Sequence, residues 1–216
     1  MALPLFDNHD SRIKYYELLL ERGLGDLPAH DLPAGYRFAL YKEGDRDKWI
    51  AIEQSAKELT SYEQGLEVWE KYYGGKDEAL KARMVFLVTE DGEYVGTATA
   101  FYDVTGRDTS GAGWLHWVAV KREHQSKGLS KPLIVHTLSI MKELGYTHAK
   151  IPTQTTTWVA CKVYLDLGFM PIPANAVHSA AGWQIIRRLT DHPALGAFPP
   201  AADGAVMGEE PCIAGE

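Results

Sequence analysis

The stretch WLHWVAVKREHQSKGLSKPLIV, residues 114–135, carries the strongest local signal in this 216-residue chain. Residues 114–120 are apolar and aromatic around one histidine, which is typical of a buried strand. Further on, Pro132 fits the first turn of a helix, where a proline has no intrahelical N–H bond to lose. We therefore expect a strand, a short loop that contains Gly128, and a helix that begins near Ser130.

The loop between strand and helix has the features of an anion-binding site. The first N–H groups of a helix lack intrahelical acceptors and carry the positive end of the helix dipole. Gly128 has no Cβ, so a phosphate could approach the backbone of residues 125–131, and Lys127 and Lys131 add positive charge. Taken alone, the same stretch is better explained as a capped helix start with solvated lysines, because short glycine motifs are weak signals.

The sequence on either side of this stretch predicts a mixed α/β (α+β) fold in a single domain. Apolar alternation and turn residues predict strands at 36–41, 83–90, 93–103, 114–120, 148–154 and 183–189. Helical spacing and end signals predict helices at 45–59, 61–75, 130–145 and 157–169. Asp91 and Gly92 predict a hairpin with a two-residue turn. The order β-α-α-β-β-β-α-β-α-β indicates one mixed sheet flanked by helices.

The two ends of the chain read differently from its centre. Residues 1–34 contain a helical pattern at 10–23 and a connector rich in Pro, Gly and Asp, so we expect an N-terminal arm with a short helix. Residues 35–190 form the predicted domain. Residues 191–216 are rich in Pro, Gly, Ala and Glu without periodicity, which predicts a flexible C-terminal tail.

Composition limits the cellular compartment and the binding partners that we expect. A formal net charge of −7 argues against sequence-independent binding to nucleic acid, which needs a basic face. No apolar run is long enough to cross a membrane, and no signal peptide is visible. Two cysteines, Cys161 and Cys212, make no framework of disulfides, so we expect a cytoplasmic setting. We expect no metal.

Two motifs together resemble those of one enzyme family. Gln125, Gly128 and Ser130 are similar to the Q/R-x-x-G-x-G/A signature of the GNAT acyl-CoA N-acyltransferases, with serine as a departure at the last position. Further along, residues 160–169 resemble the family's A-x-x-x-Y-x-x-x-G-F helix, which includes Tyr164. The resemblance covers roughly residues 35–190, because the upstream order of elements matches as well.

The resemblance implies a co-substrate, acetyl-CoA, and the residues that hold it. The backbone of the strand before the loop would bind the pantetheine arm, and the loop would bind the pyrophosphate. Thr157 stands where many relatives have Asn, and Tyr164 stands at the position of the usual general acid. The implied cofactor-binding residues are Val118, Ala119, Val120, Gln125, Ser126, Lys127, Gly128, Leu129, Ser130, Lys131, Thr157 and Tyr164.

The general base remains open at the level of sequence. Many relatives carry a carboxylate at the position of Trp114, which cannot accept a proton. His116, two residues on and on the same face of a regular strand, is the candidate base, and a hydrogen-bonded core histidine is its alternative. Glu53 and Glu58 are further candidates for steering or deprotonating an amine.

The acceptor predicted from this resemblance is a primary amine on a small molecule. Acceptors in this fold approach over the first two helices, where aromatic and acidic side chains suit an amine with an apolar body. The candidate substrate residues are Trp49, Glu53, Tyr62 and Trp114. A protein-modifying acetyltransferase and a non-catalytic acyl-CoA-binding sensor are the alternatives, and a homodimer is left open.

Overall fold

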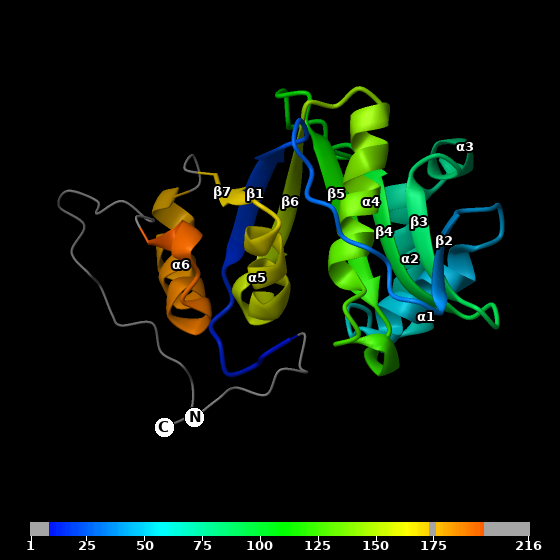
Figure 1. Ribbon diagram of the computed structural model, residues 1–216, viewed down its shortest axis with the longest axis horizontal. Helices are drawn as coiled ribbons and strands as arrows, with labels where there is room; N and C mark the ends of the chain where they lie inside the picture. Colours follow the sequence, from blue (N-terminus) through cyan, green and yellow to red (C-terminus); the bar gives the residue numbers. More distant parts are fainter. Residues whose placement is uncertain (1–8, 173–175, 197–216) are drawn as a thin grey trace. The chain divides into compact units, whose positions relative to one another are not determined.

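The computed structural model describes residues 9–172 and 176–196, and these form two compact units (Figure 1). One unit comprises Gly23–Lys150. The other comprises the chain up to Arg22 together with the chain from Ile151 onward. Both contain strands and helices, and the mixed sheet flanked by helices confirms the α/β class.

The unit Gly23–Lys150 is built on an antiparallel sheet with one parallel addition. Strands β2 (Tyr36–Leu40), β3 (Met84–Thr89), β4 (Tyr94–Phe101) and β5 (Gly113–Val120) are successive antiparallel neighbours. Strand β6 (His148–Gln154) begins in this unit and runs parallel to β5, with Ala149 opposite Gly113 and Lys150 opposite Trp114. A parallel neighbour needs a crossover, and helix α4 (Ser130–Glu143) supplies it.

The β3–β4 hairpin is confirmed, but its turn is longer than predicted. The Thr89 N–H bonds to the Glu93 carbonyl and the Gly92 N–H bonds to the Thr89 carbonyl. The turn therefore spans residues 90–92, and Gly92, with φ of 92°, supplies the left-handed residue that this loop requires.

Helices cover both faces of this sheet. Helix α1 (Arg46–Ser55), helix α2 (Tyr62–Tyr73) and the short α3 (Asp77–Leu80) form one layer. Ser61 caps α2, since its hydroxyl accepts from the Gln64 N–H at 3.1 Å. Trp49, Trp69 and Tyr73 pack with Phe86 and Phe101 of the sheet in one apolar core. On the opposite face, Gly113 of β5 leaves room for α4, because a Cβ there would meet Met141 Sδ at 3.0 Å.

Strand β5 contains a bulge near its end. Thr97 of β4 lies opposite Ala119 and Thr99 lies opposite His116, so β5 has one more residue than β4 between these pairs. Trp117, inside the bulge, has φ of 49°, an unusual conformation for an aromatic residue. The bulge falls in the segment that the sequence assigns to the pantetheine arm.

The other unit contains β1 (Glu17–Gly23), β7 (Met170–Pro171), α5 (Trp158–Asp166) and α6 (Ala176–Thr190). Strands β1 and β7 are antiparallel, with Leu20 opposite Pro171. Gly182 of α6 allows close approach of Tyr16, because a Cβ there would meet the Tyr16 Cβ at 2.8 Å. The packing of α6 in this unit thus depends on a residue without a side chain.

Two sequence predictions are wrong in this unit. The helix expected at residues 10–23 is instead strand β1, where Leu18 and Leu20 alternate as buried residues and the distant β7 supplies the partner. The strand expected at 183–189 is instead part of α6, which buries Trp183 and Ile186 at helical spacing. In both places tertiary packing outweighs local propensity.

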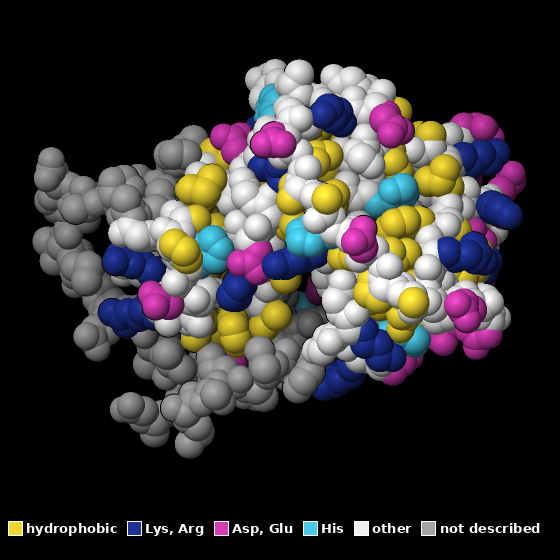
Figure 2. All heavy atoms as spheres, viewed as in Figure 1, with side chains coloured by type: hydrophobic (Ala, Val, Ile, Leu, Met, Phe, Trp, Pro, Cys, Tyr) yellow, Lys and Arg dark blue, Asp and Glu magenta, His cyan; other side chains and the backbone are white. Residues whose placement is uncertain are grey.

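The visible surface carries both signs of charge. Figure 2 shows Lys and Arg side chains interspersed with Asp and Glu rather than gathered into a single basic face. Among the helices of the described ranges, none has the length and apolar character of a membrane span. The predicted tail lies outside the described residues except for 191–196, where a short 3₁₀ turn covers Pro193–Leu195.

Candidate functional site

The loop between β5 and α4 has the backbone expected of an anion cradle. Gly128 has φ of 77°, in the left-handed region that favours glycine, and Ser126 has φ of 60°. Residues 126–128 are exposed, and α4 follows directly from Leu129. The predicted start of the helix at Ser130 is confirmed. Ser130 does not cap it, however, because Leu129 holds the N-cap position and no side-chain cap bond forms.

The loop is anchored at its base by Gln125. The Gln125 side-chain amide donates to the Val120 carbonyl at 2.9 Å, which ties the loop to the last residue of β5. The Gln125 side chain therefore fixes the start of the loop to the end of β5. The loop's own N–H groups and those of the first turn of α4 are the donors that a phosphate would find.

The positive charge around the loop is unevenly available. Lys121 forms an ion pair with Glu93 at 2.7 Å, so its charge is largely compensated. His124 Nδ1 lies 3.0 Å from the Tyr36 hydroxyl. Lys127 is exposed and Lys131 is half-buried in the first turn of α4. Exposed N–H donors, a left-handed glycine and the exposed Lys127 fit a pyrophosphate.

The last residues of β5 have backbone N–H and C=O groups along one edge that a ligand could bind. Pairing with β6 reaches Trp114 and Lys150 and, in the part of the chain described, continues no further along β5. On the other edge, Ala119 and Val120 pair with Thr97 and Gly96 of β4. The edge of residues 115–120 that faces away from β4 therefore suits the amide groups of an extended pantetheine arm. Val118 lies within the bulge.

His116 is buried, with 7% of its surface exposed. Burial lowers the pKa of His116 to about 4, opposed by the attraction of the Asp103 charge. Its ring lies 5.7 Å from those of Tyr72 and Phe101, and within the described residues its Nδ1 atom has no hydrogen-bond partner. His116 is therefore a neutral imidazole at physiological pH, and its pKa is lower than the near-neutral value expected of it from sequence.

Trp114 is fixed by a loop residue. The Trp114 Nε1 atom donates to Asp108 at 2.7 Å, and Lys150 Nζ lies 2.9 Å from the same carboxylate. Burial raises the pKa of Asp108, but hydrogen bonds from Ser110, Lys150 and Trp114 outweigh it and hold that pKa well below its usual range. The Trp114 side chain is thus held rigidly and is half-buried.

The predicted substrate residues separate into two environments. Trp49 and Glu53 are fully buried on α1, whereas Tyr62 is exposed on α2 and donates to Asp47 at 2.9 Å. Both carboxylate oxygens of Glu53 lack hydrogen-bond partners among the described residues. Burial, and then the charge of Glu58, raise the pKa of Glu53 well above its usual range.

Sequence reasoning missed two polar residues in the same layer as Glu53. They are Thr97 and Thr99, both fully buried with side-chain oxygens that have no partner in the described chain. Their signal in the sequence is weak, because they alternate within the otherwise apolar strand YVGTATAF.

Tyr164 and Thr157 belong to the unit that contains α5. Tyr164 is 6% exposed, and its ring lies 6.1 Å from that of Phe169. The Thr157 hydroxyl donates to the Gln154 carbonyl at 3.0 Å and lies 3.1 Å from the Thr153 hydroxyl. Tyr164, Gly168 and Phe169 therefore form the helix end that the second motif predicts, with Gly168 at φ of 82°.

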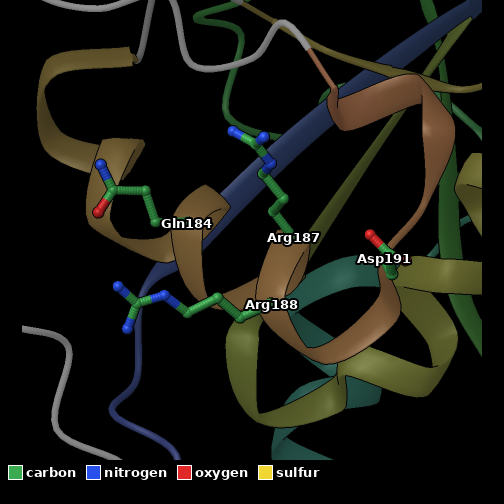
Figure 3. Close-up of a pocket in the computed structure, with 4 residues that line it drawn as sticks. All are labelled: Gln184, Arg187, Arg188 and Asp191. Atoms are coloured by element: carbon green, nitrogen blue, oxygen red, sulfur yellow. The ribbon is translucent and has the colours of Figure 1, made fainter.

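Helix α6 carries a surface hollow in the same unit. It is lined by Gln184, Arg187, Arg188 and Asp191, which Figure 3 shows projecting from successive turns. Arg187 and Arg188 point in different directions, so their guanidinium groups do not converge. In the described ranges, no cluster of three or more His, Cys, Asp or Glu side chains is arranged to hold a metal ion.

Comparison with solved structures supports the fold. The chain is similar to a GCN5-related N-acetyltransferase from Sphaerobacter thermophilus, with 19% identity, a TM-score of 0.58, and coverage of 74% of this chain and 49% of that one. It is also similar to a GNAT-family acetyltransferase from Colwellia psychrerythraea, with 14% identity, a TM-score of 0.56, and coverage of 76% and 55%. The chain thus spans about half the length of these structures.

A search among curated proteins finds no match. The sequence itself, however, matches the acetyltransferase (GNAT) family over residues 47–169. This range includes the loop before α4, the bulged strand β5 and the Tyr164 helix. The chain therefore belongs to the acetyltransferase (GNAT) family, whose common chemistry is acyl transfer.

Proposed function

We propose that this protein transfers an acetyl group from acetyl-CoA to the primary amine of a small molecule. The observation that carries the proposal is the exposed left-handed turn at Gly128, directly before the first turn of α4 and beside the free edge of β5. Pyrophosphate and pantetheine require these two kinds of backbone donor. Family membership supplies the acyl-transfer chemistry.

In the proposed reaction the amine nitrogen bonds to the thioester carbonyl carbon, and the carbon–sulfur bond breaks. The backbone N–H of Val118, in the β5 bulge, is assigned to the developing negative charge on the carbonyl oxygen. Tyr164 is assigned to give its phenolic proton to the departing thiolate, by its position in the second motif. The nitrogen must lose one proton for the products to balance.

His116 is assigned to receive that proton. With a pKa of about 4, a buried imidazole is a weak base toward a free ammonium group. The nitrogen becomes far more acidic as its bond to carbon forms, and a neutral imidazole can then accept its proton. On this account the acceptor reacts as a neutral amine, and His116 acts during bond formation rather than before it.

A second candidate function is a non-catalytic acyl-CoA-binding domain. The resemblance implies a carboxylate at position 114, but Trp114 cannot accept a proton, and its Nε1 atom is held by Asp108. Such a domain would bind acetyl-CoA through the same loop and strand edge without transferring the acetyl group.

Release of CoA thiol separates the two functions. The purified protein is incubated with acetyl-CoA and, in turn, with alkylamines, arylalkylamines, diamines and a lysine-containing peptide. Continuous thiol release with a small amine supports the proposal. Release with the peptide alone supports a protein-modifying enzyme. Saturable acetyl-CoA binding without turnover across the panel contradicts the proposal and supports the sensor.

A further inference from the structure

Residues 10–22, which we call the N-terminal segment, lie outside the range 47–169 that matches the acetyltransferase (GNAT) family. They belong to the same unit as helix α5, which carries Tyr164. The segment contacts residues at both ends of that helix. What holds α5 in this chain therefore includes residues beyond the family match.

The first contact is at Thr155, in the 3₁₀ turn (Thr155–Thr157) that leads into α5. Thr155 is fully buried, and its hydroxyl donates to the Lys14 carbonyl at 2.5 Å and accepts from the Tyr16 N–H at 2.9 Å. The backbone is joined as well, because the Thr155 N–H donates to the Tyr16 carbonyl at 3.1 Å. The side chain and the backbone of Thr155 thus both fix the start of α5 to the N-terminal segment.

Asp10 adds a contact close to the first. Its N–H donates to the Thr156 carbonyl at 2.8 Å, and the residue is 5% exposed. Hydrogen bonds from Arg12 and, to a smaller extent, from Trp158 lower the pKa of Asp10 against the opposing effect of burial. Because Trp158 is the first residue of α5, the N-terminal segment is bonded to the helix itself.

The segment also reaches the other end of α5. The Arg22 guanidinium donates to the Leu167 carbonyl, at the helix end where carbonyl groups lack intrahelical donors and a positive charge is favourable. It lies 6.0 Å from the centre of the Phe169 ring, and that ring lies 6.1 Å from the ring of Tyr164. Contacts therefore lead from Arg22 through Phe169 to the proposed acid.

Helix α6 packs against the joint between Thr155 and Tyr16. A Cβ on Gly182 would lie 3.3 Å from Thr155 Cγ2 and 2.8 Å from Tyr16 Cβ. Packing as close as this leaves little freedom for side chains to shift. The N-terminal segment and α6 together hold the start of α5 in one position.

We propose that the N-terminal segment positions Tyr164 for acetyl transfer by holding both ends of α5, with Thr155 and Arg22 as positioning residues. This inference rests on the proposed function, in which Tyr164 gives its proton to the departing thiolate. Proton transfer requires the donor within hydrogen-bond reach of the acceptor, and a displacement of about 1 Å can lower a rate roughly 100-fold. Thr155 and Arg22 act through Tyr164 and take no part in bond formation.

The test measures thiol release from acetyl-CoA with the amine of the panel above that reacts fastest. Thr155→Val keeps the shape of the side chain and removes its hydroxyl, whereas Thr155→Ser keeps the hydroxyl. Arg22→Gln removes the positive charge at the other end of α5, where the Arg22 side chain is half-buried. Thr137→Val is the matched control, since Thr137 is also fully buried and its hydroxyl donates to the Leu133 carbonyl within α4. Titration with acetyl-CoA gives the concentration of active sites in each sample.

We expect kcat to fall roughly 10-fold in Thr155→Val and in Arg22→Gln, and to stay within about twofold of the wild type in Thr155→Ser and Thr137→Val. Each change is also made in the Tyr164→Phe variant. Because Thr155 and Arg22 act through the Tyr164 hydroxyl, we expect Thr155→Val and Arg22→Gln to lower the kcat of Tyr164→Phe by less than about twofold. A role confined to stability would not depend on the residue at position 164.

Wild-type kcat in either Thr155→Val or Arg22→Gln overturns the inference. An equal fractional loss of kcat in the wild-type and Tyr164→Phe backgrounds also overturns it, since the segment then supports the fold without acting through Tyr164. If Thr155→Val does not fold, Arg22→Gln decides by the same two criteria. Thiol release absent with every amine overturns the proposed function and this inference with it, whereas the first two results leave acetyl transfer itself intact.

Discussion

Trp114 and Lys150 form the last pair of the parallel ladder between β5 and β6, and one carboxylate, that of Asp108, binds both side chains. The loop that carries Asp108 thereby fixes the point beyond which the β5 edge is available to a ligand. The fold positions its proposed acyl-binding edge through a side-chain contact as well as through backbone pairing.

Asp108→Asn should lower stability at neutral pH by roughly 1–3 kcal/mol, because it removes the charge that Lys150 and the Trp114 N–H share. Since the pKa of Asp108 is lowered in the folded protein, its contribution is present above the ordinary aspartate pKa of about 3.9 and disappears as pH falls below it. Denaturant unfolding at pH 7 and pH 3 measures both effects. The exposed Asp31→Asn is the control, and an equal loss at both pH values would refute the assignment.

Replacing His116 with Gln should reduce the loss of unfolding free energy that the wild type shows as the pH falls from 6.5 to 4. The folded-state pKa of about 4 lies below the ordinary value of about 6.5, so the unfolded chain takes up a proton first as the pH falls. Wild-type stability should fall by roughly 3 kcal/mol from this group between pH 6.5 and pH 4. Unfolding free energies across this range, with the exposed His30→Gln as control, check the prediction. Parallel wild-type and His116→Gln profiles would contradict it.

Tyr164→Phe keeps the ring that packs on Phe169 and removes the proposed proton donor. We expect kcat to fall roughly 100-fold while the affinity for acetyl-CoA changes far less, because the ring that would contact the cofactor is kept. Steady-state thiol release measures the first quantity and calorimetry the second, with Tyr15→Phe, at an exposed tyrosine, as the control. A Tyr164→Phe variant with wild-type kcat would remove Tyr164 from the mechanism.

Glu53→Leu should stabilise the protein. Leucine ends the burial of two carboxyl oxygens that have no partner among the described residues, and such replacements typically gain about 1–3 kcal/mol. Denaturant unfolding of the wild type and the variant measures the change. If Glu53→Leu is less stable than the wild type, the carboxyl group has a structural partner and the assignment is wrong.

The sequence was sufficient for the part of the fold where local signals and tertiary packing agree. The β3–β4 hairpin, the Ser61 cap and the start of α4 each follow from residues within a few positions of one another. Strand β1 does not follow from neighbouring residues, because the residue paired with Leu20 is Pro171, far along the chain. Helix α6 differs from the predicted strand because Ile185 and Ile186 favour strands locally, whereas the helix buries Trp183 and Ile186 together.

The residues of the candidate site also divide into those that a local motif predicts and those that it does not. Gly128 and Ser130 could be placed from the motif, since a loop backbone depends on few residues. The unpaired hydroxyls of Thr97 and Thr99 could not be predicted, because these residues become buried only when the helices pack on the sheet. Likewise, the low pKa of His116 follows from its burial among aromatic rings, which no local pattern reports.

Titration of acetyl-CoA into the wild type and Gly128→Val tests the central claim most directly. Valine is strained at φ of 77° and places a branched side chain on the cradle, so we predict saturable wild-type binding and at least a tenfold loss in the variant. Gly75→Val, at φ of 68° in the α2–α3 connection, controls for backbone strain and should bind like the wild type. Equal affinity of Gly128→Val and wild type would contradict the account.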